Sequence, residues 1–249
     1  MQYGICNLSI VPVRSTPADT AEMVTQLLYG ESFKILEERG KWSMIRNAFD
    51  SSEGWINNRQ VFKINEDSFS DLQDETPIYS SDLVEFITEE AGNLMAIPIG
   101  SLLNFASIKN YTFEGNILSG SGDRKALLET ALLYLNTPYL WGGKTPFGID
   151  SSGFTQMVYR LNGHSLLRNS AQQATQGEAL SFIEESEPGD LAFFDDAEGV
   201  ITHVGIIMTD NYIIHADGKV RIDRIDHSGI FNVELKKHTH QLRVIKKIL

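Results

Sequence analysis

The amino-acid sequence predicts an α+β fold, with two helices followed by an antiparallel sheet in its C-terminal half and a smaller β-rich part in front. Apolar residues recur at helical spacing within residues 123–135 and 151–163. The C-terminal stretch from Leu191 onward carries only strand signals, and residues 1–64 show short strands separated by turns. Helices first and strands second are typical of an α+β domain rather than of repeated βαβ units.

Residues 1–64 predict a small β-barrel. Residues 33–37 and 42–46 alternate between apolar and polar side chains at the strand period, and Pro17 and Gly30 mark turns between strands. The stretch also resembles the bacterial SH3-like domain through the order of four motifs: Val13-Arg14, Leu28-Tyr29-Gly30-Glu31, Trp42 and Gly54-Trp55-Ile56. This resemblance implies an SH3-like barrel at the N-terminus.

Residues 65–118 leave two interpretations open. An acidic, Ser-rich stretch over residues 65–75 reads as a connector, whereas residues 94–100 and 111–113 read as short strands. The pattern fits a second, degenerate SH3-like unit. It also fits a β-rich extension of the domain that follows.

Residues 119–249 are predicted to form one α+β domain. A flexible Ser-Gly link precedes Asp123, which can cap the first helix, and a second helix starts near Ser151 and ends at Gly163. The second helix is expected to bury its apolar residues Phe154, Met157, Val158 and Leu161. The expected strands, which would form an antiparallel sheet, cover residues 191–194, 201–208, 212–215, 220–222 and 242–245.

Composition and charge exclude several classes of function. The 249 residues include 33 acidic and 21 basic side chains, and the formal charge of −12 argues against nucleic-acid binding because it repels polyphosphate. The single cysteine, Cys6, excludes an internal disulfide and a cysteine-ligated zinc site. No apolar run is long enough to span a membrane, and no nucleotide- or metal-binding motif occurs, so we expect no cofactor.

The N-terminal residues lack the basic patch and apolar run of a secretory signal. We therefore expect a cytoplasmic protein that is a monomer. The alternative is a periplasmic or secreted mature form whose leader has been removed.

Five motifs in a fixed order carry the chemistry of the C-terminal part. They are Pro138-Tyr139-Leu140-Trp141-Gly142-Gly143, Gly148-Ile149-Asp150-Ser151-Ser152-Gly153-Phe154, Pro188-Gly189-Asp190-Leu191, His203-Val204-Gly205-Ile206 and Ile214-His215-Ala216. This order resembles the NlpC-type cysteine peptidases, a papain-like family that cuts the peptide stems of bacterial cell wall. The resemblance runs from about residue 123 to the C-terminus and implies a papain-like domain. The family motif reads Asp-Cys-Ser-Gly-Phe, whereas this chain has Ser151 at the cysteine position.

The serine changes what the site can do. A helix N-terminus and a neighbouring imidazolium can lower a thiol pKa from about 8.5 into the physiological range. The same help cannot ionise a serine hydroxyl, which needs well-placed general-base catalysis instead. We therefore predict that Ser151 is nearly inert as a nucleophile, although Ser is also a favoured helix cap.

Two explanations for Ser151 compete. One is an engineered Cys→Ser change in an active peptidase, which the intact state of the other motif positions favours. The other is a natural non-catalytic protein that keeps the cleft for binding wall peptides. A third, different kind of reading is another acyl-transfer enzyme on the same fold, because fold does not determine substrate.

The resemblance assigns roles to three more residues. His203 would be the general base, His215 would orient it and hold its tautomer, and the hydroxyl of Tyr139 would help to hold the oxyanion. A mid-strand histidine such as His203 is, by itself, more often a structural residue, and a buried tyrosine is too. The other histidines, His164, His227, His238 and His240, have no such context and are expected to face solvent.

Substrate-binding candidates flank the nucleophile position and follow its helix: Asp150, Ser152, Asn169 and Ser170. In relatives with SH3-like domains, this arrangement implies a γ-D-glutamyl-L-diamino-acid endopeptidase, also called dipeptidyl-peptidase VI. The implied partner is a murein stem peptide such as L-Ala-γ-D-Glu-diamino acid with a free α-amino group. The SH3-like domain would supply an acid and an aromatic, for which Glu22 and Trp55 are the best matches. The alternative for Glu22 is an ordinary solvated acid without a binding role, and the alternative for Trp55 is an ordinary residue of the core.

Overall fold

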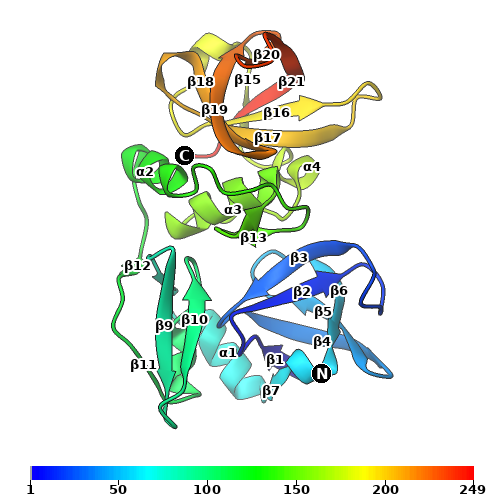
Figure 1. The fold of residues 1–249 in the computed structure, drawn as a ribbon, viewed down its shortest axis with the longest axis vertical. Coiled ribbons are helices and arrows are strands. Elements are labelled where there is room, and N and C mark those ends of the chain that lie inside the picture. The colour runs from blue at the N-terminus through cyan, green and yellow to red at the C-terminus, as the bar shows by residue number, and fades with distance from the viewer. Residues whose placement is uncertain (1) are drawn as a thin grey trace. The chain divides into compact units, whose positions relative to one another are not determined.

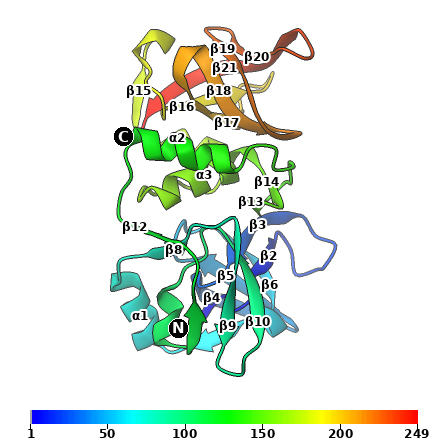
Figure 2. The same ribbon diagram turned by 60° about the vertical axis from the view of Figure 1, so that its left-hand side comes forward.

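The computed structural model describes residues 2–249, apart from the side chains of Ala106 and Ser107. It divides into two compact units (Figures 1 and 2). The N-terminal unit comprises the residues up to Gly120 together with Trp141–Pro146, and the C-terminal unit comprises Ser121–Leu140 and Phe147–Leu249.

The N-terminal unit contains a seven-stranded antiparallel sheet in the order β3-β2-β6-β5-β4-β1-β7. Alternate residues of these strands point inward, because Val11, Val13, Phe33, Ile45 and Ile56 share one buried apolar core. The SH3-like barrel predicted for this part is confirmed. Its elements are β1 (Gln2–Ile5), β2 (Ile10–Arg14), β3 (Met23–Leu28), β4 (Ser32–Arg39), β5 (Trp42–Asn47), β6 (Glu53–Asn57), η1 (Asn58–Gln60) and β7 (Phe62–Ile64).

Helix α1 (Glu66–Asp74) lies where the sequence predicted a connector. Asn65 caps it by accepting the Ser68 amide at 2.7 Å, and Phe69 is buried against the ring of Tyr3 with centroids 4.4 Å apart. The connector prediction was wrong because the acidic composition masked a capped helix with one inward aromatic residue. Tertiary burial of that residue decided the conformation.

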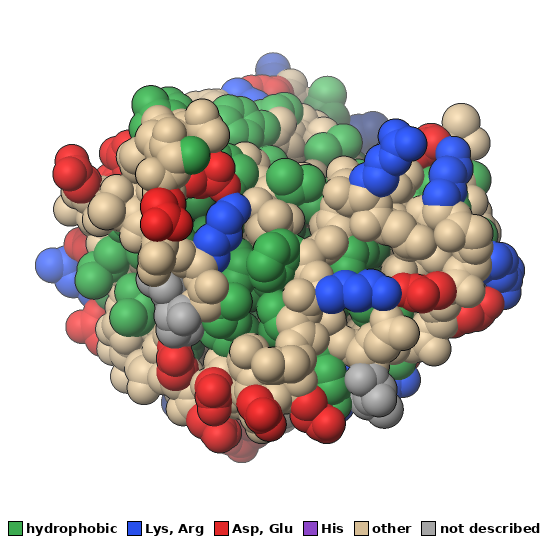
Figure 3. All heavy atoms as spheres, turned by 90° about the horizontal axis from the view of Figure 1, so that it is seen from below, with side chains coloured by type: hydrophobic (Ala, Val, Ile, Leu, Met, Phe, Trp, Pro, Cys, Tyr) green, Lys and Arg blue, Asp and Glu red, His purple; other side chains and the backbone are tan. Residues whose placement is uncertain are grey.

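The remaining part of the N-terminal unit adds two small sheets, in the orders β10-β9-β11 and β12-β8. Ile87, Ile97 and Phe105 share a core with Ile5 and Tyr29 of the barrel, so both parts fold as one unit. These elements are β8 (Ile78–Ser80), β9 (Val84–Glu89), β10 (Leu94–Pro98), η2 (Asn104–Ser107), β11 (Tyr111–Phe113) and β12 (Ile117–Ser119). Figure 3 shows apolar side chains at the centre of one face of the molecule, with most Asp and Glu side chains toward its edges.

A short segment of the NlpC-like motif belongs to the N-terminal unit. It spans Trp141–Pro146 and includes β13 (Lys144–Thr145). Gly142 has a φ of +75°, and a Cβ there would lie 2.3 Å from the carbonyl oxygen of Met23. Only glycine fits that approach. The Lys144 ammonium, which is fully buried, lies 3.0 Å from the buried Glu31 carboxylate.

The helices of the C-terminal unit are α2 (Arg124–Leu133), α3 (Ser151–Leu161) and α4 (Ser170–Gln173). Asp123 caps α2 as predicted, whereas Asp150, not Ser151, caps α3. Every residue of α3 is buried, and the helix packs against β17 and β18. No helix in the described part of the chain is both long and apolar enough to cross a membrane.

The sheet of the C-terminal unit closes into a barrel. Its strand order is β15-β21-β16-β17-β18-β19-β20, and β20 also pairs with β21, so that β16 to β21 form a six-stranded antiparallel ring (Figure 1). The predicted antiparallel sheet is confirmed, but β15, β20 and α4 were missed because they are short. The elements are β14 (Gly148–Ile149), β15 (Glu178–Leu180), η3 (Ile183–Glu185), β16 (Leu191–Asp195), β17 (Ile201–Ile207), η4 (Thr209–Asn211), β18 (Tyr212–Asp217), β19 (Lys219–Asp226), β20 (Gly229–Asn232) and β21 (Lys237–Lys247).

Candidate active site

Ser151 is the first residue of α3 and is buried. The backbone N–H groups of a first helical turn have no acceptor within the helix, and the helix dipole adds partial positive charge there. An anion next to Ser151 would therefore be stabilised. This placement is what the sequence predicted for the nucleophile position.

Asp150 holds the start of this helix. Its Oδ1 accepts the Gly153 amide at 2.6 Å, and both carboxylate oxygens accept from Arg168, with Oδ1 at 3.0 Å and Oδ2 at 2.8 Å. The hydroxyl of Ser152 lies between the two groups, 3.2 Å from Asp150 Oδ1 and 3.1 Å from Arg168. Asp150 and Arg168 are both buried. The sequence alone did not identify Arg168 as the residue that compensates the charge of Asp150.

Three side chains form a hydrogen-bonded chain inside the barrel. His203 Nε2 lies 2.9 Å from His215 Nδ1, and His215 Nε2 lies 3.1 Å from Asp223 Oδ2. They come from β17, β18 and β19, respectively, and all three are buried. The structure thus brings together the two histidines that the sequence singled out and adds Asp223, which it missed.

The strand period explains why these residues meet. Ile207, Ile213 and Ile225 belong to the barrel core. His203, His215 and Asp223 stand an even number of positions away on the same three strands, so they face the same interior. Gly205 makes room between them, because a Cβ at that position would lie 2.9 Å from the Cβ of His215.

A third histidine, His240, packs on the predicted base. The rings of His203 and His240 stack with centroids 4.1 Å apart and an angle of 25° between their planes. We expected His240 to face solvent, but it is half-buried, because closure of the barrel brings β21 over this end of the core. Burial, followed by the neighbouring His215 and His240, lowers the pKa of His203 well below 6.5. His203 is therefore a neutral base at neutral pH.

His203, His215 and His240 also offer ring nitrogens that lie within 4.8 Å of one another. A metal ion would need each lone pair to point at it from about 2.0–2.1 Å. The lone pair of an imidazole nitrogen lies in the plane of its ring. Because the rings of His203 and His240 are stacked and nearly parallel, their lone pairs do not converge on one point. As they stand, these rings are arranged for stacking rather than for coordination.

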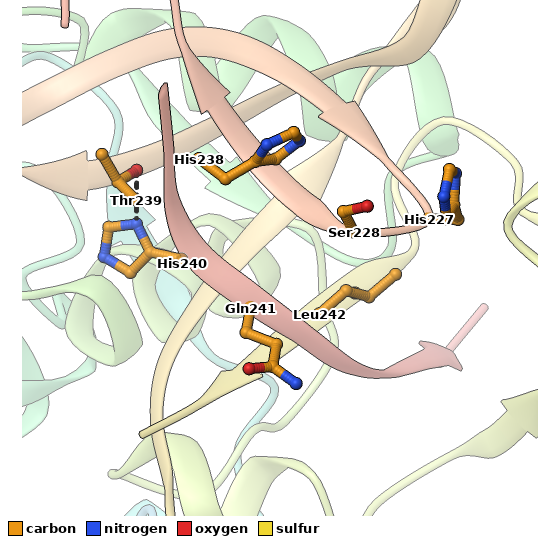
Figure 4. A pocket seen from close by; sticks show the side chains of 7 residues that line it. All are labelled: His227, Ser228, His238, Thr239, His240, Gln241 and Leu242. Carbon is orange, nitrogen blue, oxygen red and sulfur yellow. Dashed lines mark hydrogen bonds between the residues drawn. The ribbon is translucent and has the colours of Figure 1, made fainter. Parts of the chain in front are cut away.

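Figure 4 shows a surface pocket that His240 helps to line. The pocket measures about 550 Å³ and lies between the turn at His227 and Ser228 and the strand residues of β21. The His240 Nδ1 is bonded to the Thr239 hydroxyl at 3.0 Å (Figure 4). His240 thus lines this pocket and also stacks on His203.

Tyr139 lies next to the segment that leads into α3. It forms a parallel bridge with Ile149, and its side chain is 39% exposed. Partial burial, followed by the charges of Asp150 and Asp217, raises the pKa of its hydroxyl above 10.0. The hydroxyl is thus a hydrogen-bond donor at neutral pH, as oxyanion stabilisation requires.

Asn169 and Ser170 stand at the start of α4. Asn169 caps the helix by accepting the Gln172 amide at 3.0 Å, and the Ser170 hydroxyl lies 3.4 Å from the Ile201 carbonyl oxygen of β17. Both side chains thus have structural contacts, and their roles in substrate binding stay predictions.

Glu22 and Trp55 lie in the N-terminal unit. Trp55 is buried in β6, with the Arg39 guanidinium carbon 5.0 Å from its ring centroid. Glu22 is exposed and accepts a hydrogen bond of 2.7 Å from Trp141 Nε1, whose side chain is 58% exposed. The aromatic residue in contact with Glu22 is thus Trp141, and the binding roles of Glu22 and Trp55 stay predictions.

Comparison with known families finds two matching domains in this chain. Residues 136–243 match the model of the NlpC/P60 family. The chain carries an NlpC/P60 domain. Residues 13–61 match the model described as the bacterial dipeptidyl-peptidase SH3 domain, so the NlpC/P60 domain follows an SH3 domain of that type.

Relatives of known name align with most of this chain. The γ-D-glutamyl-L-lysine dipeptidyl-peptidase of Bacillus subtilis is 25% identical over 217 residues, which cover 77% of this chain and 71% of the relative. The dipeptidyl-peptidase 6 of Lysinibacillus sphaericus is 28% identical over 245 residues, which cover 83% of this chain and 85% of the relative. Both relatives are named as dipeptidyl-peptidases.

Solved structures agree on the fold. The crystal structure of an NlpC/P60 family protein from Bacillus cereus matches with a TM-score of 0.82 and 18% identity, and covers 99% of both chains. An NlpC/P60 endopeptidase from Photobacterium damselae matches with a TM-score of 0.69 and 15% identity, and covers 98% of this chain and 70% of that one. The papain-like architecture predicted for the NlpC/P60 domain is confirmed.

Proposed function

We propose that this protein is a murein-peptide hydrolase of the γ-D-glutamyl–diamino-acid type whose nucleophile position holds a serine. It binds stem peptides with a free N-terminal L-Ala and turns them over negligibly. The observation that carries the proposal is the placement of Ser151 as the first residue of α3, which packs against the two strands that hold the buried, hydrogen-bonded pair His203 and His215. The names of the Bacillus and Lysinibacillus relatives support the substrate class.

The proposed mechanism operates once a thiol replaces the Ser151 hydroxyl. His203 takes the thiol proton, and the thiolate attacks the γ-carbonyl carbon of D-Glu to form a tetrahedral oxyanion. The residue-151 backbone N–H and the Tyr139 hydroxyl donate to that oxyanion. Collapse breaks the amide bond while His203 returns the proton to the departing amine. Water then hydrolyses the thioester, again with His203 as base.

The decisive experiment compares three forms of the full chain on L-Ala-γ-D-Glu-L-Lys: Ser151 as it stands, Ser151→Cys and Ser151→Ala. Calorimetry should detect peptide binding by all three. Hydrolysis by Ser151→Cys should exceed that of the serine form by several orders of magnitude, and the serine and alanine forms should differ little. If the cysteine form is also inactive on every stem peptide, the protein is a non-catalytic wall-peptide binder.

The roles of the histidines can be separated in the Ser151→Cys form. Replacing His203 with alanine should abolish hydrolysis, because no other base replaces it. Replacing His215 with alanine should reduce hydrolysis less, because an orienting group is partly replaceable. A His215 variant that is more damaged than the His203 variant would reverse these roles.

Specificity for a free amino group can be tested with a blocked substrate. N-acetylation of L-Ala removes its positive charge and adds bulk, and an unpaired buried ammonium is costly, so a site that recognises the amine discriminates strongly. The Ser151→Cys form should cut the free peptide and spare the acetylated one. The Glu22→Ala change should weaken that preference, mainly through KM. Equal cleavage of both peptides would contradict the amine-recognition proposal.

A further inference from the structure

The buried chain His203–His215–Asp223 ends in a carboxylate that the nucleophile and base do not touch. Asp223 is 2% exposed, and among the described residues its side chain forms hydrogen bonds with His215 and Arg221. Arg221 donates to both carboxylate oxygens, from Nε to Oδ2 at 2.6 Å and from Nη2 to Oδ1 at 3.0 Å. Such paired contacts from a guanidinium hold a carboxylate in one orientation.

The donors and acceptors along this chain can be assigned one after another. An ionised carboxylate only accepts hydrogen bonds, so His215 must donate from Nε2 to Asp223. A neutral His215 then has its lone pair on Nδ1, and the contact at 2.9 Å requires His203 to donate from Nε2. A neutral His203 is left with its lone pair on Nδ1, the nitrogen that faces away from His215.

We propose that Asp223 is a positioning residue that sets the tautomers of both histidines, so that Nδ1 of His203 is the nitrogen that accepts the nucleophile's proton. The proposal rests on the hydrolase function proposed above. Without this carboxylate, the same two rings could hold the opposite arrangement, with His215 Nδ1–H donating to His203 Nε2. His203 would then carry its proton on Nδ1 and could not act as the base.

The charged groups around Asp223 keep it in its accepting form. Burial alone would raise its pKa, but the hydrogen bonds from His215 and Arg221 outweigh burial and hold the pKa below 3.8. Glu234 accepts from the outer side of Arg221 at 3.2 Å. At the other end of the chain, His240 stacks on His203. Burial and the neighbouring His215 lower the pKa of His240, and the negative charges of Asp217 and Asp223 act in the opposite direction.

The first test reads the tautomers directly and needs no hydrolysis. In the chain as it stands, ¹⁵N NMR of the imidazole nitrogens should show His203 and His215 each protonated on Nε2 at neutral pH. The Asp223→Asn change should shift part of the His203 signal to the Nδ1–H tautomer, because an amide can donate to His215. A parent chain whose His203 carries its proton on Nδ1 would overturn the proposal without any variant.

The second test uses the Ser151→Cys form and a matched control on the same strand. Asp226 also pairs with a histidine, since its Oδ2 lies 3.0 Å from His238 Nε2, but both side chains are exposed. The Asp223→Asn change should lower kcat at least about tenfold with KM within about threefold, as expected for a wrong base tautomer. Asp226→Asn should change kcat less than about twofold.

The two tests distinguish the proposal from the function on which it rests. If Ser151→Cys hydrolyses no stem peptide, the hydrolase function fails while the NMR result still decides the tautomers. If Asp223→Asn keeps kcat within about threefold of its parent, the positioning role fails while the hydrolase function stands. Thermal unfolding of each variant shows whether a loss of kcat reflects a loss of fold.

Discussion

The buried pair of Asp150 and Arg168 offers a sharp test of how the site is held together. The change is Asp150→Ala, which removes both the cap of α3 and the counter-charge of a buried guanidinium. The matched control is Asp123→Ala. Asp123 caps α2 through the same kind of bond, in which its Oδ1 accepts the Ala126 amide at 2.8 Å. It is exposed, however, and no arginine in the described part of the chain forms an ion pair with it.

The expected costs follow from these contacts. Loss of an aspartate cap costs about 1 kcal/mol, so Asp123→Ala should destabilise by about that amount. Removal of one partner of a buried ion pair costs about 3–5 kcal/mol, because the other charge stays buried and unpaired. Asp150→Ala should therefore destabilise the C-terminal unit by about 4 kcal/mol, most of it from loss of the buried ion pair with Arg168 and the rest from loss of the cap.

Urea unfolding followed by circular dichroism measures the difference. With a typical slope of about 2 kcal/mol per molar urea, Asp150→Ala should lower the midpoint by about 2 M and Asp123→Ala by about 0.5 M. The double variant Asp150→Ala/Arg168→Met should recover part of the loss, because it also removes the buried positive charge that lost its carboxylate. Equal midpoints for the two single variants would refute the reasoning, because the buried ion pair with Arg168 would then contribute no more stability than an exposed helix cap.

Three further predictions concern packing, pH and charge. Gly205→Ala should destabilise the C-terminal unit by about 1–3 kcal/mol and lower kcat of the Ser151→Cys form, because the added methyl group collides with both Ile213 and His215; urea unfolding and kinetics measure both effects. Below about pH 6.5, His203 is protonated in the unfolded chain but stays neutral in the folded protein, because burial lowers its pKa. The unfolding free energy should therefore fall with decreasing pH by up to about 1.4 kcal/mol per pH unit. A pH series of unfolding curves should show a smaller slope for His203→Gln. Lys144→Met should destabilise the N-terminal unit by about 3–5 kcal/mol, whereas Lys63→Met, which breaks the exposed pair with Glu38, should cost at most about 1 kcal/mol by the same measurement.

Much of the fold could be predicted because the elements concerned have clear local signals. The two long helices have apolar residues at helical spacing and aspartate caps, and the barrel strands alternate or run apolar over several residues. Helix α1 and the short strands β15 and β20 lack such signals. Their conformation depends on what they pack against, which a single short stretch does not reveal.

The sequence by itself determined the family resemblance, the nucleophile position at Ser151 and the choice of His203 and His215, because these residues stand in a motif of fixed order. Only the tertiary structure decided which groups complete the site. Arg168 meets Asp150 across 18 positions, and Asp223 meets His215 across 8 positions on a neighbouring strand. His240 reaches His203 through closure of the barrel. The physical reason is that strand alternation tells which side chains share a face, whereas strand pairing and register determine which of them touch.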